Sequence, residues 1–181
     1  ENGQRLLGLL NDLLDLSKLE SGMYLYHFEE SEVSSLVHYV VNSLKPLANE
    51  KNITIKFIKP DFSDLAVFDK ESITQVLINL LSNAIKFSEP ENDIQIVLDH
   101  LESGLQVSVI DKGVSIPDNE LESIFEKFVQ SSRTRTAAGG TGLGLALCKK
   151  VINDHKGKIW AQNNPEGGST LSFVIPNNVA N

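Results

Sequence analysis

A cluster of glycines directly before a helical pattern constrains this chain more than any other feature. Four of the six residues at 139–144 are glycine, in the order Gly-Gly-Thr-Gly-Leu-Gly. Glycine permits close backbone approach, and a helix N-terminus presents free N–H groups and the positive end of the helix dipole. The segment therefore predicts an anion-binding loop at the start of a helix. It lacks the Gly-Lys-Ser/Thr ending of a P-loop, and the alternative is a flexible loop without a ligand.

Apolar spacing along the rest of the chain alternates between helical and strand periods. The spacing predicts helices at 4–20, 32–50, 70–87, 117–128 and 142–155, and strands at 23–28, 53–58, 65–68, 94–101, 105–110, 158–162 and 170–175. A length of 181 residues favours one domain with a short appendage. We expect an α+β domain in which helices cover one face of a sheet.

The first helical pattern, residues 4–20, carries eight leucines and ends at Ser21-Gly22. So wide an apolar face needs partners, which are either the other helices of a bundle or coiled coil, or the core of the same domain. Because the chain begins with Glu1 and enters this helix at once, we interpret it as a piece of a longer protein. We expect residues 1–22 and 23–181 to be separate units.

Composition limits the class of protein. Hydrophobic residues make up 41% and the net charge is −8, which excludes a wholly disordered chain and disfavours binding to nucleic acid or an anionic membrane. The charge is uneven, because residues 125–160 hold seven basic and two acidic residues.

Cys148 is the single cysteine, so we expect it in the core and the chain in a reducing compartment. The four histidines share no metal-binding spacing, and we expect them at the surface or in turns.

Two further motifs carry polar side chains suited to a ligand. Asn79, Asn83 and Lys86 share one face of a helix, where amide oxygens suit Mg²⁺ and an amine suits phosphate; the alternative is a solvated helix face. Asp111 follows a strand and begins the segment 111–117, where a carboxylate at a pocket mouth would be able to accept a hydrogen bond from an exocyclic amine. The alternative there is an ordinary turn. Together with the glycine cluster these motifs predict a Mg·ATP site.

The order of these motifs resembles that of sensor histidine kinases of two-component signalling. Their N box is similar to residues 75–87, their G1 box to 111–117, their F box to 124–128, their G2 box to 140–145 and their last glycine block to 167–170. The resemblance implies the ATP-binding fold shared with DNA gyrase and the heat-shock chaperone ATPases. That fold is a two-layer α/β sandwich in which helices cover one face of a mixed sheet, here preceded by a remnant of a bundle helix.

The resemblance also implies roles for individual residues. Asn79 would coordinate Mg²⁺, and residues 129–141 would form the ATP lid. The other cofactor-binding residues that the resemblance implies are Asn83 and Lys86 at the phosphates, Phe87 beside the adenine, Asp111 at the adenine amine with Thr170 nearby, Gly142 and Gly144 at the phosphates, Gly113, Thr141 and Leu143 within the glycine boxes, and Arg133 and Arg135 in the lid.

The implied activity is phosphoryl transfer from Mg·ATP to a histidine on a dimerisation helix, and then to an aspartate of a response-regulator receiver domain. The phosphoacceptor histidine is absent from this chain, so we expect binding of ATP without autophosphorylation. The implied setting is the cytoplasmic part of a membrane-anchored homodimer, in which this fragment contacts neither membrane nor nucleic acid.

One position departs from the family pattern. Ser115 stands where the G1 box usually has a second glycine, and a side chain there could narrow the pocket. The alternative function is therefore a degenerate nucleotide-binding or pseudo-kinase interaction module. A gyrase-like ATP clamp is disfavoured, because its helix would supply a glutamate as a base for water, whereas this stretch offers Gln75 and Asn79.

Overall fold

The computed structural model describes residues 10–177, except 12, 15 and 135–139. The labelled helices are α2 (Val33–Glu50), α3 (Lys70–Phe87) and α4 (Gly144–Asp154). Single-turn 3-10 helices span Asp118–Glu120 and Ser123–Phe125. The strands are β1 (Phe28–Glu32), β2 (Thr54–Phe57), β3 (Leu65–Asp69), β4 (Asp93–Leu101), β5 (Gly104–Ile110), β6 (Lys158–Asn163) and β7 (Ser169–Pro176).

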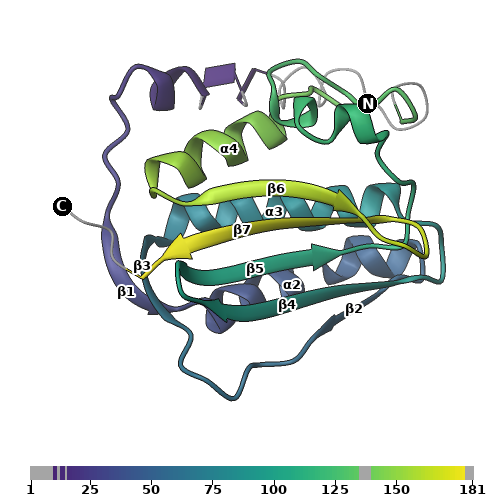
Figure 1. Ribbon diagram of the computed structural model, residues 1–181, viewed down its shortest axis with the longest axis horizontal. Coiled ribbons are helices and arrows are strands. Elements are labelled where there is room, and N and C mark those ends of the chain that lie inside the picture. Colours follow the sequence, from purple (N-terminus) through teal and green to yellow (C-terminus); the bar gives the residue numbers. More distant parts are fainter. Residues whose placement is uncertain (1–9, 12, 15, 135–139, 178–181) are drawn as a thin grey trace.

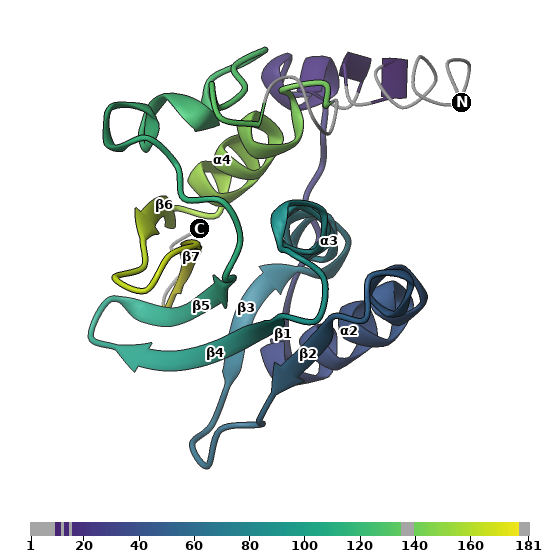
Figure 2. The ribbon, with the colours of Figure 1, turned by 90° about the vertical axis from the view of Figure 1, so that its right-hand side faces the viewer.

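Five of the strands form a mixed sheet in the order β2-β4-β5-β7-β6. The pair β2 and β4 is parallel and the other neighbours are antiparallel. α2, α3 and α4 lie on one face of this sheet (Figures 1 and 2), and β1 pairs with β3 in a separate two-stranded ribbon. The expected fold, a mixed sheet covered on one face by helices, is confirmed.

α3 lies at the centre of the helical layer, between α2 and α4. Its start is capped by Asp69, whose carboxylate accepts a hydrogen bond of 2.8 Å from the Ser72 N–H. Its apolar stripe, which includes Ile73, Leu77 and Leu80, is buried in the core. Because that stripe faces the sheet and the neighbouring helices, the polar stripe of α3 is left to line a cavity.

Two expected elements differ from the structure. The strand expected at 23–28 is wrong: residues 23–27 form no ladder, and pairing begins at Phe28. An alternating pattern reports only that successive side chains point to opposite sides. Here Tyr24 and Tyr26 pack against the core, and Leu25 between them is exposed. The helix expected at 117–128 is instead two separate 3-10 turns.

A linker joins the N-terminal helical segment to the layers of sheet and helices. Residues 10–20 are helical where described and lie above α4 (Figures 1 and 2), with Leu16 and Leu19 buried. Glu20 forms an ion pair with Lys127, and Ser21 Oγ closes the helix by donating to the Lys18 carbonyl at 2.9 Å. The segment is thus packed on the rest of the chain, while the boundary expected at residue 22 stays a prediction.

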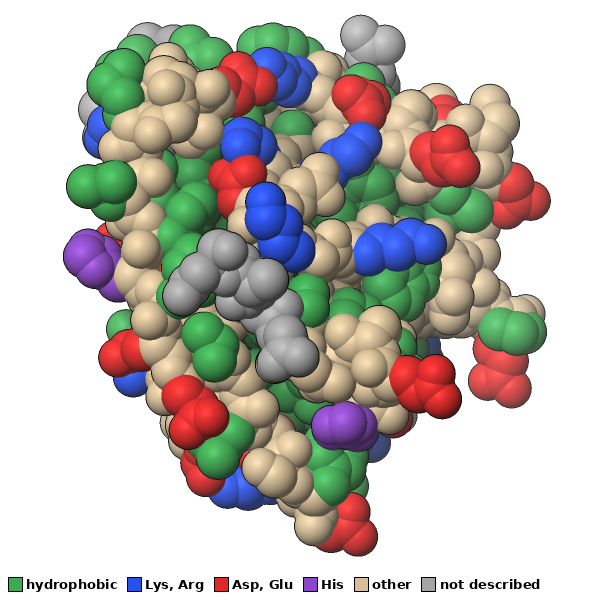
Figure 3. Space-filling model, turned by 60° about the vertical axis from the view of Figure 1, so that its left-hand side comes forward, with side chains coloured by type: hydrophobic (Ala, Val, Ile, Leu, Met, Phe, Trp, Pro, Cys, Tyr) green, Lys and Arg blue, Asp and Glu red, His purple; other side chains and the backbone are tan. Residues whose placement is uncertain are grey.

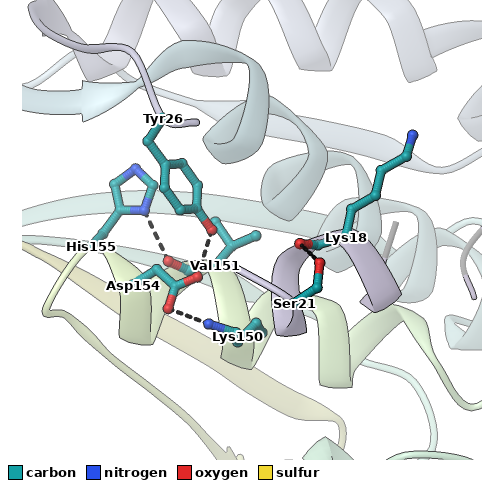
Figure 4. Close-up of polar contacts among 7 residues, drawn as sticks. All are labelled: Lys18, Ser21, Tyr26, Lys150, Val151, Asp154 and His155. Atoms are coloured by element: carbon teal, nitrogen blue, oxygen red, sulfur yellow. Dashed lines mark hydrogen bonds and ion pairs between the residues drawn. The ribbon is translucent and has the colours of Figure 1, made fainter. Parts of the chain in front are cut away.

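His155 connects this linker region to the ends of two helices. Its Nε2 accepts the N–H of Asp69 at 3.1 Å, so the ring proton is on Nδ1, which donates to the Val151 carbonyl at 2.8 Å. Next to it, Tyr26 donates to Asp154 at 2.8 Å (Figure 4). Burial lowers the pKa of His155, because desolvation disfavours the imidazolium. His155 lies in the turn after α4, as expected, but it is fully buried, because helical spacing does not reveal what covers a helix end.

Candidate functional site

A cavity of about 260 Å³ lies beside the C-terminal half of α3. Its walls are the polar face of α3, the segment after β5, the stretch from Ile124 to Gly144 where described, and the start of β7. The lining residues are Asn79, Asn83, Ala84, Lys86, Phe87, Asp111, Val114, Ile116, Ile124, Val129, Gln130, Ser131, Thr134, Gly140, Thr141, Gly142, Gly144, Leu145, Ser169 and Leu171. The volume is near that of sites for small organic ligands.

α3 supplies the amide and ammonium groups of the cavity. Asn79, Asn83 and Lys86 lie on the wall, as their i, i+4 and i+7 spacing predicts. The Nδ2 of Asn79 lies 3.5 Å from the carbonyl oxygen of Gly144, which fixes the amide against the start of α4. Lys86 Nζ lies 4.9 Å from the centre of the Phe87 ring, a cation–π distance.

Asp111 is the carboxylate of the cavity and is 3% exposed. Its Oδ1 accepts the Gly113 N–H at 2.8 Å and its Oδ2 accepts the Ser169 hydroxyl at 2.7 Å. Burial raises the pKa of Asp111, and these hydrogen bonds offset part of the rise. A partly desolvated carboxylate with oxygen lone pairs toward a cavity is suited to accept a hydrogen bond from an amine of a ligand.

The glycine cluster forms the turn that leads into α4. Gly142 has φ of +70°, and a Cβ there would lie 2.8 Å from the Phe128 carbonyl carbon, so both conformation and space require glycine. The Phe128 N–H donates to the Gly142 carbonyl at 2.8 Å, and the Leu143 N–H donates to Thr141 Oγ1 at 3.2 Å. The first turn of α4 therefore begins at the cavity wall next to Asn79.

The structure brings together eight of the thirteen residues that the sequence singled out. Asn79, Asn83, Lys86, Phe87, Asp111, Thr141, Gly142 and Gly144 line the cavity. Gly113, Arg133, Leu143 and Thr170 are not among the lining residues, and Arg135 lies outside the described residues.

Gly113 and Leu143 support the cavity from behind its wall. A Cβ on Gly113 would lie 2.7 Å from the Phe87 carbonyl carbon, so the glycine permits the segment after β5 to pass close to the end of α3. The Leu143 side chain is fully buried in the core. Both positions follow from backbone packing, which a motif does not report.

β7 presents Ser169 and Leu171 to the cavity in place of Thr170. Alternate residues of a strand point to opposite sides, and the hydroxyl of Thr170 donates to Asn164 Oδ1 at 2.6 Å. The sequence reasoning missed Ser169. The signal that could have found it is the pleat of the strand at 169–176, combined with the buried face that Leu171 and Phe173 share with it.

Arg133 and Ser115 form a contact beside the cavity. Arg133 Nη1 donates to the Ser115 carbonyl at 3.1 Å, and the Ser115 hydroxyl donates to the Gly168 carbonyl at 3.3 Å. Ser115 is not among the lining residues. Its side chain therefore connects the segment after β5 to the turn before β7 and does not narrow the cavity.

Among the residues that the structure describes, the basic side chains of 125–160 do not line the cavity. Lys86 and Asp111 are the ionisable side chains among the described residues of the lining, and neither belongs to residues 125–160. Lys149 and Lys150 of that segment pair with Glu126 and Asp154 at 2.7 and 2.5 Å. Figure 3 shows basic side chains gathered in the upper part of one face, interspersed with acidic ones. Residues 125–160 nevertheless border the cavity, which Gln130, Thr141 and Gly142 line, although the ion-paired Lys149 and Lys150 lie outside the lining.

Similarity to known proteins extends over most of the chain. The family described as "Histidine kinase-, DNA gyrase B-, and HSP90-like ATPase" matches residues 68–179. The sensor histidine kinase WalK of Bacillus subtilis is 34% identical over 176 residues, which cover 96% of this chain and 29% of WalK. The chain thus spans less than a third of that relative's length.

Two solved structures share the fold, and one of them is a histidine kinase. Full-length ShkA in complex with AMPPNP is similar with a TM-score of 0.84 at 26% identity, over 100% of this chain and 38% of that one. Histidine kinase ThkA in complex with the response regulator TrrA is similar with a TM-score of 0.79 at 29% identity, over 98% of this chain and 48% of that one.

Proposed function

Because the chain belongs to the family of histidine kinase-, DNA gyrase B- and HSP90-like ATPases, we propose that its cavity binds the Mg·ATP with which a sensor histidine kinase phosphorylates a histidine. The observation that carries the proposal is the convergence of three groups on one cavity: the Asn79, Asn83 and Lys86 face of α3, the start of α4 and buried Asp111. ShkA, which is similar along this whole chain, was solved with AMPPNP, and this supports an ATP-like ligand.

The phosphates would lie at the end of the cavity where α3 meets α4. Lys86 and Asn83 would donate to phosphate oxygens, and Gly142 and Gly144 would place the N-terminus of α4 toward the same anion. The residues present also fit Mg²⁺. Asn79 offers a hard amide oxygen, and the described residues contain no cluster of three His, Cys, Asp or Glu side chains that could hold a metal. An ion that keeps bound waters and binds mainly through nucleotide phosphates needs no such cluster. Its positive charge would offset the negative charge of the phosphates.

The adenine would lie at the other end, over apolar side chains of the lining. Val114, Ile116 and Leu171 supply a surface for a flat base, and Asp111 would accept a hydrogen bond from its exocyclic amine. Phe87 would pack beside the base. Thr170 would act near the adenine only if it released Asn164, to which its hydroxyl donates at 2.6 Å.

The lid arginines would complete the phosphate contacts. In this structure Arg133 donates to the Ser115 carbonyl, so it would reach a phosphate only after leaving that oxygen. The role of Arg135 stays a prediction, as does the role of the lid as a whole.

In the reaction that we propose, the bond between the γ-phosphorus and its bridging oxygen breaks, a bond to a histidine nitrogen forms, and ADP leaves. The imidazole loses its proton in the transfer. The acceptor would lie on a dimerisation helix outside this chain, and the phosphoryl group would pass next to a response-regulator aspartate. ThkA was solved with its response regulator, which supports this kind of partner. As in other phosphoryl transfers, the domain would contribute positioning and charge stabilisation.

The wider setting is also a proposal. Residues 1–22 would pair with a second copy in a homodimer, and residues 23–181 would form the catalytic domain in the cytoplasm. Within the part of the chain that the structure describes, no helix has both the length and the apolar character to cross a bilayer.

Calorimetric titration with ADP and Mg²⁺ tests the proposal. We expect saturable binding, and we expect Asp111→Asn to weaken it about tenfold or more, since a hydrogen bond to a charged group contributes about 1.5–3 kcal/mol. Asp99→Asn, which changes an exposed carboxylate of β4, should bind like the wild type. No heat at millimolar ligand would favour the pseudo-kinase alternative.

Incubation with γ-labelled ATP tests the position of the acceptor. We expect no stable label on this chain, because none of its four histidines stands in a phosphoacceptor context. An acid-labile label on the chain would contradict that part of the proposal and leave nucleotide binding to be judged by the titration.

A further inference from the structure

Lys51 bridges the ends of two helices. Its backbone N–H closes α2 by donating to the Ala48 carbonyl at 3.1 Å. Its half-buried side chain crosses to the end of α3, where Nζ donates to the carbonyls of Ile85, Lys86 and Ser88 at 3.0, 2.7 and 3.2 Å. All three protons of one ammonium group are thus directed at the end of a single helix.

These contacts complete the hydrogen bonding of the α3 C-terminus, whose last carbonyls have no partner within the helix. Apart from the three that bind Lys51, the Ala84 carbonyl accepts the Ser88 N–H at 3.0 Å, and the Phe87 carbonyl lies 3.4 Å from the Val114 nitrogen. A cation at this end also stabilises the negative pole of the helix dipole. The last turn of α3 is therefore held by Lys51 on one side and by the segment after β5 on the other.

The same last turn carries two residues of the cavity. Lys86 and Phe87 line it, and the Lys86 carbonyl is the acceptor of the shortest of the three Lys51 contacts. We propose that Lys51 is a positioning residue for nucleotide binding, which holds the last turn of α3 so that Lys86 and Phe87 face the ligand. The ligand's identity rests on the proposed function.

Lys51 is not among the lining residues, and its ammonium group binds main-chain carbonyls at the end of α3, so its effect on binding must pass through the helix end. If Lys51 acts in stability alone, its replacement should lower the free energy of unfolding and leave the ADP affinity of the folded protein unchanged. If Lys51 is a positioning residue, its replacement should also lower the ADP affinity, and it should do so only while the Lys86 side chain is present.

The test is a double-mutant cycle on ADP affinity, measured by calorimetry with Mg²⁺ well below the unfolding temperature. We expect Lys51→Met to weaken binding about tenfold and Lys51→Arg, which keeps a donor, to restore most of it. When Lys86 is already replaced by Met, Lys51→Met should lower the logarithm of the ADP affinity by less than about half as much as it does in the wild type. Lys56→Met is the matched control, since Lys56 forms an exposed ion pair with Asp93.

Two outcomes would overturn the inference. One is unchanged ADP affinity in folded Lys51→Met, and the other is additivity of the two substitutions. Hydrogen exchange of the ligand-free protein reports directly whether Lys51 holds the last turn of α3. We expect the Ser88 amide to exchange faster in Lys51→Met than in Lys56→Met. A wild-type chain that fails to bind ADP would instead refute the proposed function, with the exchange result still deciding whether Lys51 holds the turn.

If Lys51→Met does not fold, the wild type supplies the measurement. ADP should shift the ¹³Cε resonance of Lys51 and leave that of Lys56 in place. Equal or absent shifts at both would overturn the coupling.

Discussion

Replacing Ser169 by alanine tests the buried contact that holds Asp111 in the cavity. The Ser169 hydroxyl donates to Asp111 Oδ2 at 2.7 Å, and both residues are buried. Removing the donor leaves a buried carboxylate oxygen short of a partner. A hydrogen bond to a charged group contributes about 1.5–3 kcal/mol, so we expect the free energy of unfolding to fall by about 2 kcal/mol at neutral pH.

Ser172→Ala is the matched control on the same strand. Ser172 is as buried as Ser169, but its hydroxyl pairs with the neutral Ser108 hydroxyl at 2.9 Å. Ser108 keeps a second partner, because Gln106 Nε2 donates to it at 2.9 Å. We therefore expect the control to lose about 1 kcal/mol or less.

The pH dependence separates the charged contact from simple loss of packing. Burial raises the folded-state pKa of Asp111 above its unfolded value, so this carboxyl contributes most to stability when protonated, and the contribution is lost as the pH rises through the folded-state pKa. The Ser169 hydroxyl lowers that pKa, and its removal raises it further. The difference in free energy of unfolding between wild type and Ser169→Ala should therefore be largest at neutral pH. It should become smaller as the pH falls through the raised pKa of Asp111.

Urea unfolding of both variants at several pH values measures these differences. Equal losses for Ser169→Ala and Ser172→Ala at neutral pH, or a Ser169→Ala loss that stays constant down to acidic pH, would refute the charged hydrogen bond as the source. Calorimetry on the same samples should also show weaker ADP binding in Ser169→Ala.

Three other predictions follow from burial and close approach. Gly113→Ala should cost about 1–3 kcal/mol and weaken ADP binding, because its Cβ would lie 2.7 Å from the Phe87 carbonyl carbon; unfolding and titration of the variant measure both. Burial lowers the pKa of His155 from 6.5, so wild-type stability should fall as the pH drops below about 6.5, where the unfolded chain takes up the proton first. In His155→Phe that part of the pH profile should be flat, and an unchanged slope would contradict the buried neutral ring. Phe173→Ala should lose about 3–5 kcal/mol, read from the urea midpoint, since Phe173 is fully buried.

Local patterns were enough to predict much of this fold. The stripe of α3 that includes Ile73, Leu77 and Leu80 has helical spacing, so its buried face follows from the sequence alone. The same spacing places Asn79 and Asn83 on a shared polar face. The glycines before α4 predicted a helix start with free N–H groups, and the structure places that start on the cavity wall.

The unpredicted features depend on partners distant in sequence. The stretch at 23–28 alternates like a strand, yet β1 forms only where β3 supplies an edge to pair with. The sequence places His155 just after a helix, but the linker and the start of α3 bury it. Lys127 belongs to a basic segment of the sequence, but in the structure it forms an ion pair with Glu20.

The sequence by itself determined which side chains share a polar helix face or precede a helix start, because helix and strand periods are local properties of the backbone. Only the tertiary structure decided which of them meet. It placed Ser169 and not Thr170 at Asp111 through the pleat of β7, and it directed Lys51 across to the end of α3. Both results depend on how strands and helices pack against one another, and residues far apart in the chain carry no local pattern that records that packing.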